Sequence, residues 1–454
     1  MNDTPAFELT KEFHELFNQA IETKDVEFIR DSLEGADHAD ISSLLNEFNP
    51  EQSKYVLDLL DTSVGANIII EMDEDSRGKF LDEFDSAEIA GYVDQLETDD
   101  GADILYGLPV KEREQVISAM LNEEKARNIV ELLHYDEDVA GGLMAKELIK
   151  ANLNWTIKQC IEEIRKQAEH VENIYSVYVV NNNDKLLGKV SLKKLIISSD
   201  LTKVGDIYDS DIHSVETFTP EDEVAAIMRK YDLDVIPVVN LKGQLMGRIT
   251  NDDIIDVITE LAEEERQLMA GIATDVEEDD SIWKLSRARL PWLMIGLVGG
   301  SIAAYFIGFF ESEIILIPAM SFFIPLIMAT GGNVGIQSSS IIVQSLASRN
   351  AFEESMWNRL FKSLLVSIVN GAVLSIAVYF IVFSFDSDST IAMVVAIALF
   401  SVVLLASFMG TITPLILNKF DINPALASGP FITTANDLLG LLVYFGVASA
   451  LYQF

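Results

Sequence analysis

The sequence predicts a multidomain protein that joins an acidic helical solenoid, a pair of α/β modules, a linker helix and an α-helical membrane domain. Three observations lead to this fold class. Apolar residues recur every 12 residues between 40 and 125, two later segments repeat each other at an offset of 59 residues, and five long apolar stretches follow residue 290. We place the domains at residues 1–140, 141–260, 261–286 and 287–454.

The 12-residue period predicts a stack of short helices. Each unit ends in an apolar residue that is followed by turn or cap residues, as at Asn49-Pro50 and Asp85-Ser86. Helices of this kind form a solenoid with one continuous core. Most of the acidic residues here are then caps and solvated faces, but Asp99, Asp100 and Asp103 gather at one turn. The periodic positions are Phe48, Leu60, Met72, Phe84, Leu96, Leu108 and Met120.

The 59-residue repeat predicts two copies of one α/β module. Residues 179–191 align without gaps on residues 238–250, and each copy gives a strand, a turn, a strand and a helix, the pattern of a CBS module. Paired modules of this kind serve either as a dimer scaffold or as a site for ATP or another adenosyl nucleotide. In the second case a Thr-x-x-Asp pattern offers its Asp to the ribose. Asp253 follows Thr250 with this spacing, whereas Ser191-Leu192-Lys193-Lys194 departs from it.

The five apolar stretches predict five membrane spans, at about 20 residues for each span. The second stretch contains Pro318 and Pro325, so we expect a kinked or broken helix there. Lys and Arg lie before the first span and in alternate loops, which predicts a multi-pass protein of the cell membrane with the N-terminus in the cytosol and the C-terminus outside. The stretches are 290–310, 314–346, 361–385, 390–417 and 425–453.

Charge is distributed very unevenly along the chain. Residues 290–454 contribute −4 to the formal charge of −40, which leaves −36 on residues 1–289. Such a surface excludes nucleic acid as an expected partner and favours cations. Cys160 is the sole cysteine, so disulfides within the chain are excluded and a reducing compartment is indicated.

Asp437 is the most unusual residue of the membrane domain, because it is the sole side chain of the stretch 425–454 that is charged at neutral pH. A carboxylate at bilayer depth costs roughly 2.5–3.5 kcal/mol, so it is retained where it faces a partner, a cation or water. Small residues and prolines surround it. Packing of helices explains the small residues, but it leaves the carboxylate unexplained. The pattern indicates a cation pathway.

Acidic residues also crowd the helix expected after the second α/β module. Several of them are i,i+4 pairs of like charge, which destabilise an isolated helix. The face is either solvated or relieved by divalent cations that bridge carboxylates from several domains. The residues are Asp252, Asp253, Asp256, Glu260, Glu263, Glu264 and Glu265.

The order of these domains resembles the MgtE family of Mg²⁺ channels, and so do the strings GGNVGIQSSS (331–340) and PALASGPFITTANDLLGL (424–441). The resemblance covers essentially the whole chain. It implies a homodimer in the lipid bilayer with a pore on the two-fold axis, where Asp437 is the pore carboxylate and Asn333 lines the path. At the inner mouth the family pattern leads us to expect an acid at the position of Asn423, but here the acid is Asp421.

The resemblance also implies that cytosolic Mg²⁺ closes the channel by holding the solenoid, the CBS pair and the linker helix together. The carboxylates expected to bind this regulatory Mg²⁺ are Asp99, Asp103, Asp253, Asp256, Glu264 and Glu265.

Other functions fit the residues less well. A transporter of Mn²⁺, Co²⁺ or Ni²⁺ remains open, because the sequence does not distinguish divalent cations. A membrane aspartyl enzyme needs two carboxylates at one site, and one chain has only Asp437 at depth. An anion channel would be lined by basic residues or helix N-termini. We therefore do not expect an enzyme.

Overall fold

The computed structural model describes residues 10–452, except 169–170, 172, 274–275, 277–279, 348–354, 387–388, 421 and 428. The chain divides into two compact units, Met1–Ile258 and Thr259–Phe454.

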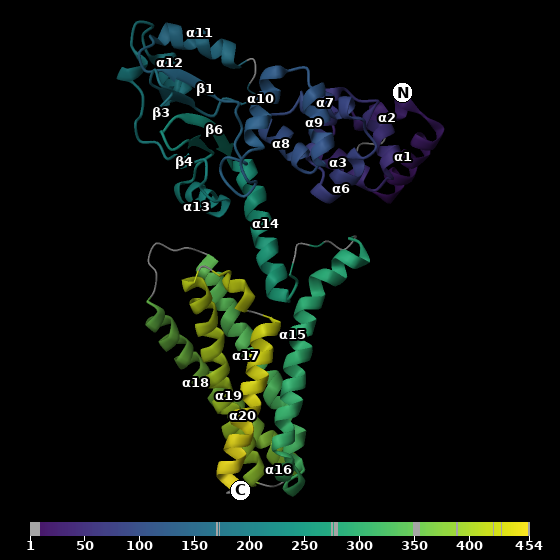
Figure 1. Ribbon diagram of the computed structural model, residues 1–454, viewed down its shortest axis with the longest axis vertical. Coiled ribbons are helices and arrows are strands. Elements are labelled where there is room, and N and C mark those ends of the chain that lie inside the picture. Colours follow the sequence, from purple (N-terminus) through teal and green to yellow (C-terminus); the bar gives the residue numbers. More distant parts are fainter. Residues whose placement is uncertain are drawn as a thin grey trace. The chain divides into compact units, whose positions relative to one another are not determined.

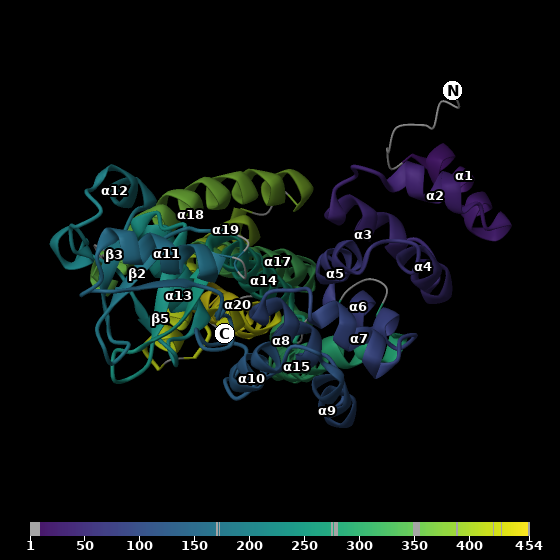
Figure 2. The same ribbon diagram turned by 90° about the horizontal axis from the view of Figure 1, so that it is seen from above.

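The first unit begins with the predicted solenoid of short helices. Helices two apart in the chain pack on one another, as α5 does on α3 and on α7. Figure 2 shows these helices following one another in a row. The helices are α1 (Lys11–Thr23), α2 (Val26–Leu33), α3 (His38–Asn46), α4 (Pro50–Leu57), α5 (Thr62–Ile70), α6 (Glu74–Leu81), α7 (Ser86–Val93), α8 (Thr98–Tyr106), α9 (Val110–Ala119) and α10 (Glu123–Leu132).

The predicted caps explain where several of these helices begin. Asn49 and Asp85 each form a capping box with the residue three positions later, and Asp73 accepts from the Ser76 amide. Asp61 precedes α5 but makes no side-chain cap hydrogen bond. The period of 12 residues is thus one short helix plus its turn, repeated.

The CBS pair follows as two three-stranded sheets with the same topology. Each sheet joins a parallel pair to an antiparallel pair, in the orders β1-β2-β3 and β4-β5-β6. Leu186 and Leu245 donate backbone hydrogen bonds of 2.9 Å across the modules, to Gly243 and Asp184 respectively. The elements are β1 (Ile149–Asn152), α11 (Ile157–Gln167), β2 (Val177–Val180), β3 (Leu186–Val190), α12 (Leu192–Ile197), η2 (Val204–Asp206), β4 (Val215–Glu216), α13 (Glu221–Tyr231), β5 (Val235–Val239) and β6 (Leu245–Thr250).

The solenoid and the second CBS module share one hydrophobic core. Buried residues from α1 to α10 form a continuous cluster with Met144, Val224 and Ile236, whereas the first module has a core of its own. The rings of Tyr135 and Phe218 lie 5.6 Å apart at this junction. The end of the solenoid is therefore held against the second module by apolar packing.

The acidic linker helix is α14 (Asn251–Ala270), which starts directly after β6. The segment 261–286, predicted as the linker helix, thus includes the second half of α14 and the start of α15 (Ile282–Phe309). The helix ends at Gly271, whose φ of +80° is a conformation that glycine adopts at helix C-termini. The next helix begins only after Ser281, which caps it through the Lys284 amide.

The second unit contains five helices long and apolar enough to cross a membrane, within the residues that the structure describes. The predicted break in the second stretch is found before Pro318, between two helices, while Pro325 and Gly331-Gly332 lie inside one helix. Figure 1 shows α17 to α20 as a bundle, in which α19 packs on the other three. The helices are α15 (Ile282–Phe309), α16 (Glu311–Leu316), α17 (Ala319–Ala347), α18 (Met356–Asp386), α19 (Ser389–Lys419), η3 (Pro424–Ala427) and α20 (Pro430–Tyr452).

Candidate functional site

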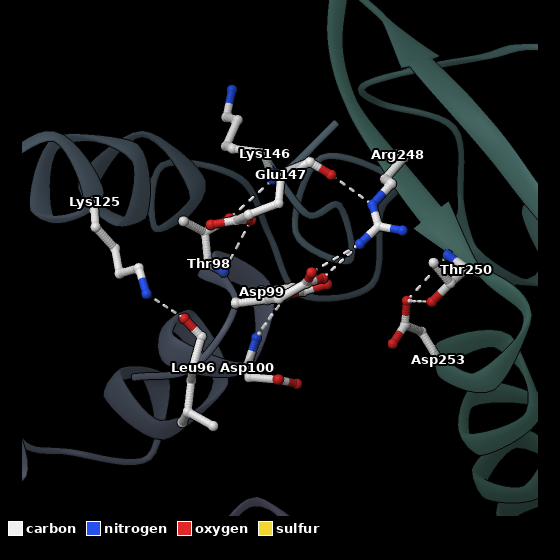
Figure 3. A network of polar contacts seen from close by, with 11 residues as sticks. Leu96, Thr98, Asp99, Asp100, Lys125, Lys146, Glu147, Arg248, Thr250 and Asp253 are labelled. Carbon is white, nitrogen blue, oxygen red and sulfur yellow. Dashed lines mark hydrogen bonds and ion pairs between the residues drawn. The ribbon is translucent and has the colours of Figure 1, made fainter. Parts of the chain in front are cut away.

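A cluster of carboxylates surrounds the N-terminus of α8, where the solenoid meets the CBS pair (Figure 3). Thr98 is fully buried there, and its amide and hydroxyl both donate to Glu147 Oε2, at 3.2 and 2.7 Å. The Lys146 amide donates to the Thr98 hydroxyl at 2.8 Å. Thr98 thereby ties the start of α8 to the segment that leads into β1, and it places the neighbouring Asp99 in the junction.

The ligand atoms of three carboxylates converge in this cluster. One oxygen each from Glu97, Asp99 and Glu147 lies within 4.8 Å of the others. Two oxygens on one Mg²⁺ are at most about 4.2 Å apart, because each Mg²⁺–O bond is about 2.1 Å long. The spacing therefore suits a Mg²⁺ that keeps part of its water shell. Direct binding by all three oxygens would require them to move closer, because neighbouring ligands of an octahedral Mg²⁺ lie about 3 Å apart.

Burial and mutual repulsion destabilise the ionised form of the carboxylates in the cluster. Burial first, and then the neighbouring Asp100 and Asp253, raise the pKa of Asp99 well above its usual value. Burial, Asp103 and Asp253 raise the pKa of Asp100 to about 7. Raised values mean that the ionised carboxylates are destabilised where they lie. A bound divalent cation would relieve this repulsion.

Asp253 reaches the cluster from the start of α14. Its Oδ2 accepts from the Thr250 amide at 3.1 Å and from the Thr250 hydroxyl at 2.6 Å, so it caps the helix in the manner of a capping box. Burial still raises the pKa of Asp253, although these hydrogen bonds and Arg248 oppose the shift. The Thr-x-x-Asp pattern that predicted ribose binding is therefore used here as a helix cap.

The neighbouring cleft of the CBS pair is small. Tyr175, Tyr178 and Arg248 line a cavity of about 10 Å³, which has room for a single water-sized molecule. A nucleoside does not fit into this cavity as it stands. In contrast, an open groove of about 1100 Å³ runs between solenoid and CBS pair past Glu97 and Asp100, and it gives ions a route to the cluster.

The remaining predicted regulatory acids are more dispersed. Asp103 is exposed one turn beyond Asp99, and its charge contributes to the raised pKa of Asp100. Asp256 and Glu264 are exposed on α14. Although the Asp256 side chain is exposed, nearby protein atoms still desolvate it in part and raise its pKa, with help from Asp252. Burial raises the pKa of Glu265, with help from Glu264. Within the described residues, only Asp99 of the predicted acids belongs to the group of three convergent carboxylates.

Asp437 lies on α20 beside the glycine turn of α17. A Cβ placed on Gly332 would lie 3.7 Å from Asp437 Oδ1 and 3.4 Å from Thr433 Cγ2. These are ordinary van der Waals distances, and they place Asp437 next to the α17 turn that carries Asn333. Asn333 itself is exposed in the single chain. Among the described residues, Asp437 has no ion-pair partner.

The neighbouring Asn436 is a polar residue of the membrane unit that the sequence did not single out. Its side chain is 1% exposed, and neither amide atom has a hydrogen-bond partner within the described residues. It packs on Gly335, where a Cβ would lie 1.9 Å from its Nδ2. Asn423, by contrast, caps η3 by accepting from the Ala425 amide at 2.9 Å, and Asp421 lies outside the described residues.

The end of α14 contacts the start of α20. A Cβ on Gly429 would lie 2.5 Å from the Met269 carbonyl oxygen, and a Cβ on Gly271 would lie 2.7 Å from Pro430 Cγ. Both glycines have positive φ, so both the backbone conformation and the close approach require glycine. The acidic linker helix thus ends directly against the helix that carries Asp437.

Comparison with known proteins agrees with this architecture. The family described as divalent cation transporter, MgtE, matches residues 324–447; the MgtE intracellular N domain matches 36–138; and CBS domains match 138–199 and 204–260. The magnesium transporter MgtE of Bacillus subtilis is 33% identical over 78% of this chain and 78% of its own length. The chain belongs to the MgtE family. The family model places an intracellular domain at the N-terminus, as the charge pattern predicted.

A second MgtE protein and a solved cytosolic domain also resemble this chain. The magnesium transporter MgtE of Thermus thermophilus is 30% identical over 96% of this chain and 97% of its own length. A crystal structure of the cytosolic domain of the Mg²⁺ channel MgtE in complex with ATP is 29% identical, with a TM-score of 0.50 over 54% of this chain and 99% of that one. The predicted family and the predicted fold class are therefore confirmed.

Three members of the soluble cluster were missed in the sequence, namely Glu97, Glu147 and Arg248. Glu97 and Glu147 looked like ordinary members of a very acidic surface. Arg248 carried a stronger signal, because it lies inside the buried second strand of a repeat, a position where a charge needs a partner.

Proposed function

We propose that this chain is a Mg²⁺ channel or transporter of the cell membrane and that its ion path passes Asp437. The observation that carries the proposal is the position of Asp437 within the matched MgtE domain, beside Gly332 and without a basic partner among the described residues. Mg²⁺ is the cation named for the similar transporters. Because Mg²⁺ gives up water reluctantly, a carboxylate that contacts the hydrated ion avoids most of the cost of dehydration.

The pore is proposed to lie on the two-fold axis of a homodimer, so that two Asp437 carboxylates face each other and Asn333 lines the path beside them. A two-fold axis is how a chain with one deep carboxylate builds an anionic ring. The exposure of Asn333 and Gln337, one turn apart on α17, supports a face that is completed by a second chain. Mass measurement of the purified protein in detergent tests the dimer.

Cytosolic Mg²⁺ is proposed to close the path by binding to the junction between solenoid and CBS pair. Convergence of the Glu97, Asp99 and Glu147 oxygens, together with Asp253 nearby, supports a divalent site that forms only when the solenoid is docked. Asp103, Asp256, Glu264 and Glu265 are proposed to contribute further weak sites. Since α14 ends against α20, docking of the solenoid would be transmitted to the pore helix through Gly271 and Gly429.

Topology and ligands complete the proposal. The C-terminus is proposed to lie outside the cell, which an intracellular N domain followed by five spans supports. Mn²⁺, Co²⁺ and Ni²⁺ remain alternative ions, and a flux competition experiment distinguishes them. ATP binding by the CBS pair rests on the ATP complex of a similar cytosolic domain, and in this chain it would require the 10 Å³ cleft to open. No enzymatic reaction is proposed.

Mg²⁺ flux into liposomes tests the pore directly. We expect the purified wild-type protein to conduct Mg²⁺ and the Asp437→Asn variant to be inactive while it still elutes as a folded dimer. Glu311→Gln is the matched control, because it removes one acidic charge at the exposed start of α16. Wild-type flux in Asp437→Asn would overturn the proposal.

A further inference from the structure

One arginine lies inside the carboxylate cluster of the soluble unit. Arg248 is 3% exposed, and its Nη2 donates to both oxygens of Glu97, at 2.9 and 2.7 Å (Figure 3). Its Nε donates to the Glu147 carbonyl oxygen at 2.6 Å, and its guanidinium lies 5.0 Å from the centre of the Tyr175 ring. A guanidinium this deeply buried is stable only where its charge is matched.

The two ends of this ion pair come from different domains. Glu97 directly precedes α8 of the solenoid, and Arg248 lies in β6 of the second CBS module. The bond therefore closes a junction that is otherwise crowded with like charges from Asp99, Asp100, Glu147 and Asp253. The Arg248 guanidinium therefore supplies a positive charge to this junction whether or not a metal ion is bound.

Backbone contacts hold the arginine in position. Its amide and carbonyl both pair with Ala145, at 2.9 and 2.8 Å, and the adjacent Lys146 bonds to Thr98 and, through Nζ, to Glu131 at 2.8 Å. The segment 145–147 is thus a bridge between β6 and the solenoid. On the solenoid side Lys125 donates to the Leu96 carbonyl, which fixes the turn that carries Glu97.

We propose that Arg248 is an internal cation that keeps the solenoid docked on the CBS pair in the absence of divalent cations and so sets how strongly docking depends on Mg²⁺. Without Arg248, the charges of Glu97, Asp99, Asp100, Glu147 and Asp253 would depend on bound metal alone for neutralisation. With Arg248 already neutralising Glu97, part of the docked population persists without metal, and Mg²⁺ supplies the remainder. The second half of this proposal rests on the proposed regulation by Mg²⁺, whereas the first half does not.

We call the Arg248–Glu97 ion pair the latch. Hydrogen exchange of the full-length protein in lipid nanodiscs tests the latch without relying on Mg²⁺ flux. The Thr98 amide donates across the junction to Glu147, so exchange of peptides that contain residues 98–101 reports undocking. In EDTA we expect Arg248→Gln to raise this exchange by about tenfold or more, because removing one partner of a buried charge pair leaves the other unmatched. At saturating Mg²⁺ we expect exchange to return to the wild-type level.

Three controls separate the latch from a general loss of stability. Lys166→Gln removes an equal charge from an exposed i,i+3 pair and should leave junction exchange unchanged. Arg248→Lys keeps the charge but loses the Nε bond to the Glu147 carbonyl oxygen, so it should restore part of the protection. Peptides that cover β2, in the separate core of the first module, should exchange as in the wild type.

A double-mutant cycle completes the test. If the pair acts as a latch, Glu97→Gln and Arg248→Gln each raise junction exchange in EDTA, and the double variant raises it by less than the product of the two single effects. Wild-type protection of Arg248→Gln in EDTA overturns the proposal, and so does a strictly multiplicative cycle. A wild-type protein whose junction ignores Mg²⁺ would instead contradict the proposed regulation, while the EDTA comparison would still decide the latch.

Discussion

The soluble cluster and the membrane site use the same chemical group in opposite ways. Around α8, several carboxylates share one built-in cation, Arg248, and are held in a network of short hydrogen bonds. On α20, Asp437 has no cationic partner among the described residues and lies against glycine. Because Arg248 neutralises part of the carboxylate charge, the cluster can hold the solenoid on the CBS pair without metal, and bound Mg²⁺ can then strengthen this docking. A single carboxylate at bilayer depth is suited to a transported ion, which must bind and then be released.

The largest expected effect comes from the membrane site, where there is one carboxylate and no substitute. We predict that Asp437→Asn reduces Mg²⁺ flux to the background of empty liposomes. Because the charge is removed without a change in shape, the protein should still fold and elute as a dimer. Fluorescence of an internal Mg²⁺ indicator measures the flux, with Glu311→Gln as the control.

The next largest effect should come from removing two acids of the soluble cluster together. We predict that Asp99→Asn with Asp253→Asn leaves flux intact at low cytosolic Mg²⁺ and abolishes its decrease up to about ten millimolar Mg²⁺, a range suited to weak carboxylate sites. Flux and junction exchange, followed over the same titration, measure this. If the decrease persists unchanged in the double variant, these two residues do not bind the regulatory Mg²⁺.

A smaller effect is expected where the two regions are connected. Gly429→Ala places a methyl group 2.5 Å from the Met269 carbonyl oxygen at a residue with φ of +60°, so the end of α14 must move away from α20. We predict that Mg²⁺ still protects the junction in this variant but reduces flux less than in the wild type. Gly446→Ala is the control, since a Cβ there meets nothing within 4 Å. Equal Mg²⁺ responses of flux in both variants would mean that this contact does not transmit docking.

The smallest effect should follow from loss of one hydroxyl. Thr98→Ala removes a donor to Glu147 and an acceptor for the Lys146 amide, each worth about 0.5–1.5 kcal/mol. We predict that several-fold more Mg²⁺ is needed to protect the junction from exchange, with flux at zero Mg²⁺ unchanged. Thr23→Ala, at the exposed end of α1, removes a hydroxyl that bonds only its own helix and should have no effect.

The contrast between the two regions also explains how much the sequence could predict. The soluble fold could be predicted from its repeats, because the 12-residue period is a helix plus its cap and the 59-residue offset is a duplicated module. Asp437 was found from composition alone, since a charge in an apolar stretch stands out. The soluble site was found only in part. Asp99 and Asp253 were expected, but Glu97 and Glu147 were hidden among 72 acidic residues.

Two further differences arise from contacts that a sequence does not display. The linker helix ends at Gly271 because that residue adopts positive φ against Pro430, a contact with a residue far away in the chain. Asn436 draws no attention beside Asp437, yet it is buried on Gly335 with both amide atoms unpaired within the described residues. Long-range packing decides both features.

The separation of the two regions into a pore and a sensor is tested most directly by measuring flux and junction exchange on the same reconstituted samples, with and without about ten millimolar Mg²⁺. We predict that the two variants fail in opposite ways. Asp437→Asn should lose flux but keep the Mg²⁺-induced protection of residues 98–101, whereas the Asp99→Asn, Asp253→Asn double variant should keep flux and lose that protection. Retained flux in the first variant, or lost flux with normal protection in the second, would contradict this prediction.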